Sequence, residues 1–322
     1  MKNQIVNKAV IAGKLFSFKL EKKTVSKQGD NFGKEFIRGE IDIQTDEEGL
    51  NVVPIYYNFI TPTFSKSGKK DSRYDILEEI INTKASVEEV GPEKAMILST
   101  SGSIGVNDYY DINNTKQIVS QTRVENAFIN KITAIPEDES KRNEFTLDAI
   151  LNNVKVIEED EEKGIDKTYI EISGATFDFR KALIPITFTL RDPDGIDFIL
   201  GMDLSSKNPF FTKIWGMIRN ATIKIPHTEE AAWGPAKVTY TTKIEREYLI
   251  SGLNGSGYGF GDEDSITENE LKTIIQNREV HLAEVKQQRE QYAAEQNTIS
   301  ATVSPKGTVS GFTVATNKAF NF

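Results

Sequence analysis

The sequence predicts a mainly β protein that contains two small barrels in tandem, followed by a long helix and a flexible tail. Two observations lead to this fold class. Most of residues 1–252 consists of short segments in which apolar and polar residues alternate with the period of two that is typical of strands. The order of the elements, three strands, a helix and two strands, also occurs twice along the chain.

The first unit contains the clearest strand pattern of the chain. Ile37, Ile41 and Ile43 fall on one side of a strand expected at 35–43, and polar residues fall mostly on the other. In the strand expected at 51–59, the same parity assigns Ile55, Tyr57 and Phe59 to the core and leaves Tyr56 on the opposite face. The complete set is strands at 5–20, 35–43, 51–59, 95–98 and 118–129, with a helix at 72–81. This is the order of a five-stranded OB barrel.

The second unit repeats this order in a weaker form. Strands are expected at 145–157, 168–172, 182–190, 221–225 and 238–250, with a helical patch at 210–218. Residues 53–57 resemble residues 184–188, and residues 122–132 resemble residues 243–253. These two local sequence similarities favour a duplicated barrel.

The predicted organisation therefore has six parts. Thr267 and Glu270 have the spacing of a capping box and predict the start of the C-terminal helix. The parts are a first OB-like barrel at 1–134, a linker at 135–143, a second OB-like barrel at 144–253, a Gly-rich and acidic linker at 254–264, a helix at 265–296 and a flexible tail at 297–322.

Composition argues against catalysis. The 322 residues include no cysteine and only two histidines, which excludes thiolate metal sites, disulfides and cysteine nucleophiles. No phosphate-binding loop is present, the carboxylates occur in runs typical of solvated surfaces, and residues 192–197 suit a turn better than a calcium loop. We therefore expect no enzyme activity, no cofactor and no metal. The absence of a long apolar run predicts no membrane partner and a cytoplasmic protein.

Charge and aromatic residues indicate a binding function instead. The net charge is −9, but residues 1–34 contain eight lysines and two acidic residues, a local charge of +6. Sequence-independent binding of single-stranded DNA requires cations along the phosphates and rings on which bases stack. In an OB barrel the second and third strands and the first and last loops form the ligand face. The residues expected there are Lys14, Phe16, Phe18, Lys22, Lys23, Lys34, Phe36, Arg38, Tyr56, Lys66, Lys69 and Lys70.

A short motif near the start resembles a known family. Val10-Ile-Ala-Gly-Lys-Leu15, followed by a basic loop with Gly29 and a returning strand, is similar to the opening of bacterial and phage OB-fold single-stranded DNA-binding proteins. The resemblance covers about the first third of the chain, and the tandem barrels look like those of phage members. It implies a role in DNA replication or recombination in the cytoplasm of the host cell, with replication or recombination proteins as further partners.

Two points stay open at this level. Members of that family often end in an acidic tail with a terminal Phe, whereas this chain ends in Phe322 with Lys318 nearby and no acidic residue close to it. The main alternative is a structural protein of a phage particle, whose β domains and tail at 297–322 join subunits. The sequence also leaves open whether copies of the chain form a homo-oligomer.

Overall fold

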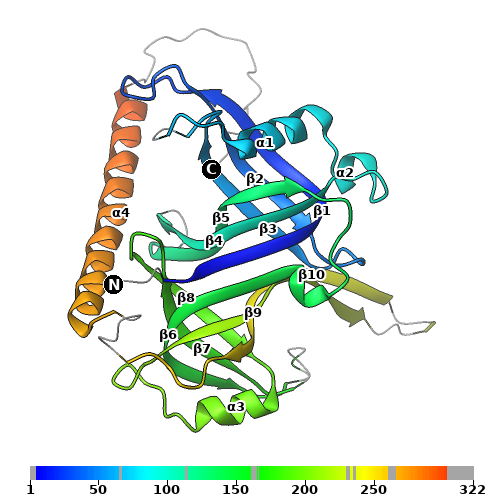
Figure 1. Cartoon of the computed structure of the whole chain (residues 1–322), viewed down its shortest axis with the longest axis vertical. Helices are drawn as coiled ribbons and strands as arrows, with labels where there is room; N and C mark the ends of the chain where they lie inside the picture. The colour runs from blue at the N-terminus through cyan, green and yellow to red at the C-terminus, as the bar shows by residue number, and fades with distance from the viewer. Residues whose placement is uncertain are drawn as a thin grey trace.

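The computed structural model describes residues 5–302, apart from 65–66, 113–114, 161–164, 166, 230–232, 235–236 and 260–265. Its ten strands form two barrels stacked along the long axis of the molecule, and one long helix lies beside both (Figure 1). The strands are β1 (Asn7–Thr24), β2 (Glu35–Gln44), β3 (Val52–Ile60), β4 (Ile97–Tyr110), β5 (Ile118–Lys131), β6 (Asn143–Ile157), β7 (Tyr169–Phe177), β8 (Leu183–Leu190), β9 (Phe210–Glu229) and β10 (Lys237–Leu253). The mainly β fold class and the two OB-like barrels are those predicted from the sequence.

The first barrel closes through the strand order β1-β2-β3-β5-β4, in which β1 pairs with both β2 and β4. The β3–β5 pairing is parallel and all other pairings in this ring are antiparallel. Helix α1 (Ser72–Thr83) lies between β3 and β4 in sequence and closes one end of the barrel. Asp71 caps its first turn, and Tyr74, Leu77 and Ile80 are buried, as the apolar spacing of the segment predicts. The short helices α2 (Val87–Val90) and η1 (Glu139–Lys141) follow α1 and β5.

The second barrel closes in the same way, with the order β6-β7-β8-β10-β9 and a β6–β9 pairing. The helical patch expected at 210–218 is wrong, because this segment is the start of β9. Its residues pair with β6 on one side and β10 on the other, and these ladder hydrogen bonds override the helix-like spacing of its rings. The helix of this barrel is α3 (Pro193–Leu200), and the Asp192 carboxylate caps it by accepting a hydrogen bond from Gly195 N, at 2.8 Å.

The two barrels share one continuous sheet. The start of β1 pairs with the start of β6, from Asn7 opposite Leu147 to Ile11 opposite Asn143. A second contact is made by Asn220 of β9, whose backbone N–H donates to Asn51 Oδ1 at 2.7 Å and whose side-chain amide donates to Val52 O, at the start of β3. Two separate attachments therefore fix the angle between the barrels.

The core follows the predicted alternation until a bulge interrupts it. Ile37, Ile41 and Ile43 of β2 are fully buried, as are Ile55 and Tyr57 of β3. The expectation for Phe59 is wrong, because its side chain is 39% exposed. The β2–β3 register shifts between Ile37 and Gly39, so that an extra residue of β3 moves Phe59 to the outside and Ile60 to the inside.

Helix α4 (Glu268–Thr302) extends beyond the predicted end at residue 296 and runs beside both barrels (Figure 1). The capping box is confirmed: Thr267 N donates to Glu270 Oε2 at 2.9 Å, and Glu270 N donates to Thr267 Oγ1 at 3.2 Å. Farther along, Arg278 donates to the buried Asp108 of β4 at 2.7 Å. No helix in the described part of the chain combines the length and apolar character needed to cross a bilayer. Residues 303–322, most of the predicted tail, lie outside the described residues.

Candidate functional site

Cationic and aromatic side chains gather on the outer surface of β1, β2 and β3. Strand pairing places Lys19 opposite Glu40 and Glu40 opposite Tyr56, with Glu21 opposite Arg38 and Lys23 opposite Phe36. Opposed residues of an antiparallel pair point to the same side of the sheet, so these side chains share a surface. We call it the outer face: Lys19, Glu21, Lys23, Phe36, Arg38, Glu40 and Tyr56. Lys23, Phe36, Arg38 and Tyr56 of the predicted set are thus brought together.

The cations of the outer face are paired with carboxylates. Lys19 Nζ lies 3.0 Å from Glu40 Oε1, and Glu21 Oε2 lies 2.7 Å from Lys23 Nζ and 3.2 Å from Arg38 Nε. The hydrogen bond to Glu40 raises the pKa of Lys19, and the hydrogen bonds from Lys23 and Arg38 lower the pKa of Glu21. Exposed pairs of this kind contribute little to stability, so a stronger anionic ligand can exchange with the carboxylates.

Tyr56 lies where two concave surfaces meet. It lines a groove of about 540 Å³ on the outer face, together with Lys19, Arg38 and Glu40. It also lines a second space, between the barrels. The Arg123 guanidinium of β5 lies over the Tyr56 ring, 4.7 Å from its centroid. Partial burial and the nearby Glu40 raise the pKa of Tyr56, so its hydroxyl stays neutral near pH 7.

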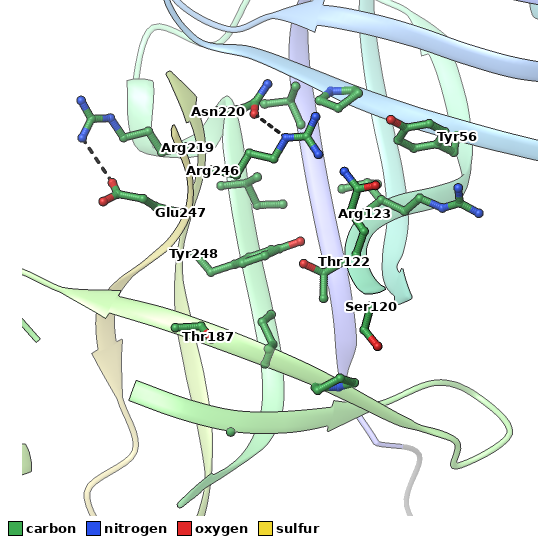
Figure 2. A pocket seen from close by; sticks show the side chains of 18 of the residues that line it. Tyr56, Ser120, Thr122, Arg123, Thr187, Arg219, Asn220, Arg246, Glu247 and Tyr248 are labelled. Atoms are coloured by element: carbon green, nitrogen blue, oxygen red, sulfur yellow. Dashed lines mark hydrogen bonds and ion pairs between the residues drawn. The ribbon is translucent and has the colours of Figure 1, made fainter. Parts of the chain in front are cut away.

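The space between the barrels is a cavity of about 510 Å³, which we call the inter-barrel cleft. Strands β3 and β5 supply one wall, and β7, β8, β9 and β10 supply the other (Figure 2). Three arginines reach it. Arg123 comes from the first barrel, and Arg219 and Arg246 come from the second. Arg246 Nε donates to Asn220 Oδ1 at 3.1 Å, and Arg219 Nη1 lies 3.2 Å from Glu247 Oε2.

The remaining β1 predictions are corrected by a second bulge. The β1–β2 register shifts between Leu15 and Ser17, so Phe16 is the extra residue and Phe18 lies opposite the buried Ile41. Phe18 packs against the hydrophobic core and does not reach the outer face. Phe16 and Lys14 are half-buried, away from Tyr56 in the strand register. The shared parity expected for Lys14, Phe16 and Phe18 therefore does not produce one surface.

The other predicted lysines lie around the loops and α1. Lys22 points to the end of the barrel, where its amine contacts Glu78 of α1 at 2.8 Å and Glu35 at 3.3 Å. Lys70 pairs with Asp75 of α1 at 2.8 Å. Lys34 donates to Asn31 within the β1–β2 loop, and Lys69 is exposed. Lys66 lies outside the described residues. None of these described lysines lines the outer-face groove or the inter-barrel cleft.

The sequence analysis missed Lys19, which lines the outer-face groove, and Arg123, Arg246 and Tyr248, which line the inter-barrel cleft. A signal for the last three was present. The resembling segments 122–132 and 243–253 are the matching strands β5 and β10 of the two barrels, and each contributes an arginine. Burial raises the pKa of Tyr248 to about 12, and its hydroxyl points toward Thr122 across the cleft (Figure 2).

Another cavity, of about 580 Å³, lies between α4 and the two barrels. Its lining includes Asp108, Glu125 and Asp178 together with Arg278 and His281, and Arg278 is paired with Asp108 at 2.7 Å. Within the described ranges, no group of three or more His, Cys, Asp or Glu side chains could hold a metal ion.

Comparisons with known proteins give a family and distant structural likenesses. A family model described as YorF matches residues 6–295. No curated protein matches the sequence. A deletion variant of the single-stranded DNA binding protein from Thermus aquaticus is 11% identical, covers 81% of this chain and 98% of its own, and has a TM-score of 0.46. The wild-type Thermus aquaticus protein is 10% identical, covers 78% of this chain and 93% of its own, and has a TM-score of 0.43. A chain of a replication protein A heterotrimer bound to single-stranded DNA is 7% identical, covers 75% of this chain and 49% of its own, and has a TM-score of 0.20.

Proposed function

The chain belongs to the YorF family, and we propose that it binds single-stranded DNA, without catalysis, along the outer face and the inter-barrel cleft. The observation that carries this proposal is the position of Tyr56, which lies under the Arg123 guanidinium and borders both concave surfaces. A strand that follows the two surfaces meets rings and cations throughout its path. These are the two ingredients of sequence-tolerant single-strand binding.

The rings favour a single strand over a duplex. In a duplex, the faces of each base are covered by its neighbours, so they are not accessible to a protein ring. The outer face offers Tyr56 and Phe36, and the exposed Phe59 ring lies beside Phe36, with 4.6 Å between the ring centroids. Unstacked bases can lie on these rings, each contributing about 1–3 kcal/mol.

The paired carboxylates set the electrostatic behaviour. Phosphates must replace Glu21 and Glu40 as partners of Lys19, Lys23 and Arg38, because each of these cations is already neutralised in the unbound protein. Binding then releases counterions from the DNA, but the electrostatic gain in binding free energy is smaller than three unpaired cations would give. We therefore expect affinity that falls with added salt, on a protein whose overall net charge is −9.

The biological role belongs to the same proposal. Largely sequence-independent coating of exposed single strands suits DNA replication or recombination, and the tandem barrels and the opening motif of the sequence favour a bacteriophage source. Replication or recombination proteins are the expected protein partners.

A fluorescence titration tests the proposal. Tyrosine and tryptophan emission is followed as oligo-dT, or a duplex of the same length, is added at two salt concentrations. We expect quenching by the single strand, weaker binding of the duplex, and an affinity that falls as salt rises. Equal affinity for both forms, or binding that does not respond to salt, contradicts the proposal.

A further inference from the structure

The inter-barrel cleft differs in chemistry from the outer face. Hydrogen-bonding side chains without net charge converge on it from both barrels: Ser120, Gln121 and Thr122 from β5, Thr187 from β8, and Asn220 from β9. Binding that ignores sequence has no need of such groups, because rings and cations suffice. Concave sites that place a few polar groups around an apolar lining usually select a ligand by its hydrogen-bonding pattern.

We propose that the inter-barrel cleft receives one nucleobase of the bound strand and reads its edge, favouring bases that carry carbonyl oxygens over adenine. This inference rests on the proposed function, because it adds base selection at one position of the same track. The volume of about 510 Å³ lies within the range of small-molecule sites, which suits a single extruded base.

Arg246 is the central group of this proposal. Its Nε donates to Asn220 Oδ1 at 3.1 Å, and the Asn220 amide in turn donates to Val52 O, so the guanidinium plane is held from the wall of the cleft. The end of Arg246 reaches into the space between Asn220 and Tyr56 (Figure 2). A guanidinium has only donors, and its planar fork matches a pair of acceptors on a base edge.

The neighbouring groups complete the pattern. Within the described residues, the Gln121 amide has no hydrogen-bond partner although it lines the cleft, so it can supply a donor and an acceptor to a ligand. Glu247 is the acidic residue of the lining, and it is neutralised by Arg191 at 2.5 Å and Arg219 at 3.2 Å. Guanine and cytosine each present a carbonyl oxygen beside a ring-nitrogen acceptor, which matches the fork of Arg246, and thymine presents single carbonyl oxygens. As acceptors, adenine presents ring nitrogens only.

Oligonucleotide titrations with matched variants test the inference. Dissociation constants are measured for oligo-dT, oligo-dC and oligo-dA of one length at one salt concentration. The proteins are the wild type, Arg246→Lys, Gln121→Ala and the control Gln287→Ala, whose residue lies on the exposed surface of α4. Arg246→Lys keeps the positive charge and removes the planar fork, so it separates base reading from phosphate attraction. Gln121→Ala changes a half-buried side chain that has no hydrogen-bond partner in the described part of the chain.

We expect the wild type to prefer oligo-dT and oligo-dC over oligo-dA by about fivefold to tenfold, in the range of one good base contact. The preference falls toward one in Arg246→Lys and stays at the wild-type value in Gln287→Ala. Gln121→Ala weakens binding of the three oligonucleotides to a similar extent, because a glutamine amide can pair with the edge of any base. Intrinsic differences in stacking and flexibility between the oligonucleotides are the same for every protein. A preference that changes with the protein therefore reports the cleft.

The remaining outcomes each overturn the inference in a recognisable way. Equal affinity for the three oligonucleotides, a preference for oligo-dA, or a preference unchanged in Arg246→Lys refutes base reading and leaves strand binding intact. Loss of binding to all three removes the proposed function as well. If the mononucleotides dTMP and dAMP are distinguished while the oligonucleotides are not, the cleft takes a free nucleotide and the strand-reading proposal is wrong.

Discussion

The double substitution of Lys19 and Arg38 by alanine tests the assignment of the outer face most directly. Both cations line the groove that contains Tyr56. If they contact DNA phosphates, their removal lowers the number of counterions released on binding. The affinity then depends less steeply on salt.

The size of the effect follows from the number of phosphates lost. Each phosphate contact with a single strand contributes about 0.7 to the slope of log affinity against log salt. Two lost contacts reduce the slope by about 1.4, so the affinity change between 50 and 200 mM salt shrinks by about sevenfold. Glu40 and Glu21 also lose a partner in this variant, which adds repulsion toward the strand and lowers affinity further.

Lys22→Ala is the matched control, because Lys22 follows Lys19 by three residues but is held by Glu78 and Glu35 at the end of the barrel. The assay is a titration of oligo-dT at four or more salt concentrations, with circular dichroism to establish that each variant folds. We expect the slope to fall for the double variant and to stay at the wild-type value for Lys22→Ala. An unchanged slope in the double variant, or an equal fall in the control, refutes the outer-face assignment.

Three further predictions concern the ring, the barrel junction and α4. Tyr56→Ala should weaken oligo-dT binding by about 1–3 kcal/mol through lost stacking; a loss confined to duplex DNA would contradict it. Asn220→Ala removes the side-chain bond to Val52 at the start of β3 and should lower the free energy of unfolding by about 1–3 kcal/mol in urea titrations, and no change would mean that this attachment is not stabilising. Glu270 has its pKa lowered to about 2 by hydrogen bonds from Thr267 and Lys181, so its support of the α4 start is complete above pH 4.5 and is lost as the pH falls toward 2. Amide exchange in the first turn of α4 should follow this window in the wild type and not in Glu270→Gln.

The barrel order could be predicted from the sequence because apolar alternation reports burial directly. Ile37, Ile41 and Ile43 are buried as their parity indicates, and the capping box at Thr267 and Glu270 forms as its spacing requires. These signals are local, so the tertiary structure does not need to be known. The resemblance between the segments that form β5 and β10 predicted the duplicated barrel for the same reason, because it is also a local signal.

The binding surface was harder to predict because it depends on register. One bulge in β1 turns Phe18 inward, and another in β3 turns Phe59 outward. Gly39, a glycine inside β2 with a φ of 129°, is the one sequence signal beside the β2–β3 bulge, and it does not say which way the neighbouring side chains turn. The inter-barrel cleft is still less accessible to sequence reasoning. Arg123 and Arg246 are far apart in the chain and share a cavity only because the two barrels are fixed against each other.

The pairing of β1 with β6 has a consequence during synthesis. Asn7 to Ile11 leave the ribosome long before their partners Asn143 to Leu147, so one side of β1 has unsatisfied backbone groups in the meantime. An open strand edge of this kind readily recruits another chain. The N-terminal barrel is therefore synthesised with an unpaired strand edge, which β6 of the second barrel later covers. Nascent chains that stall before residue 143 are the ones most exposed to misassembly.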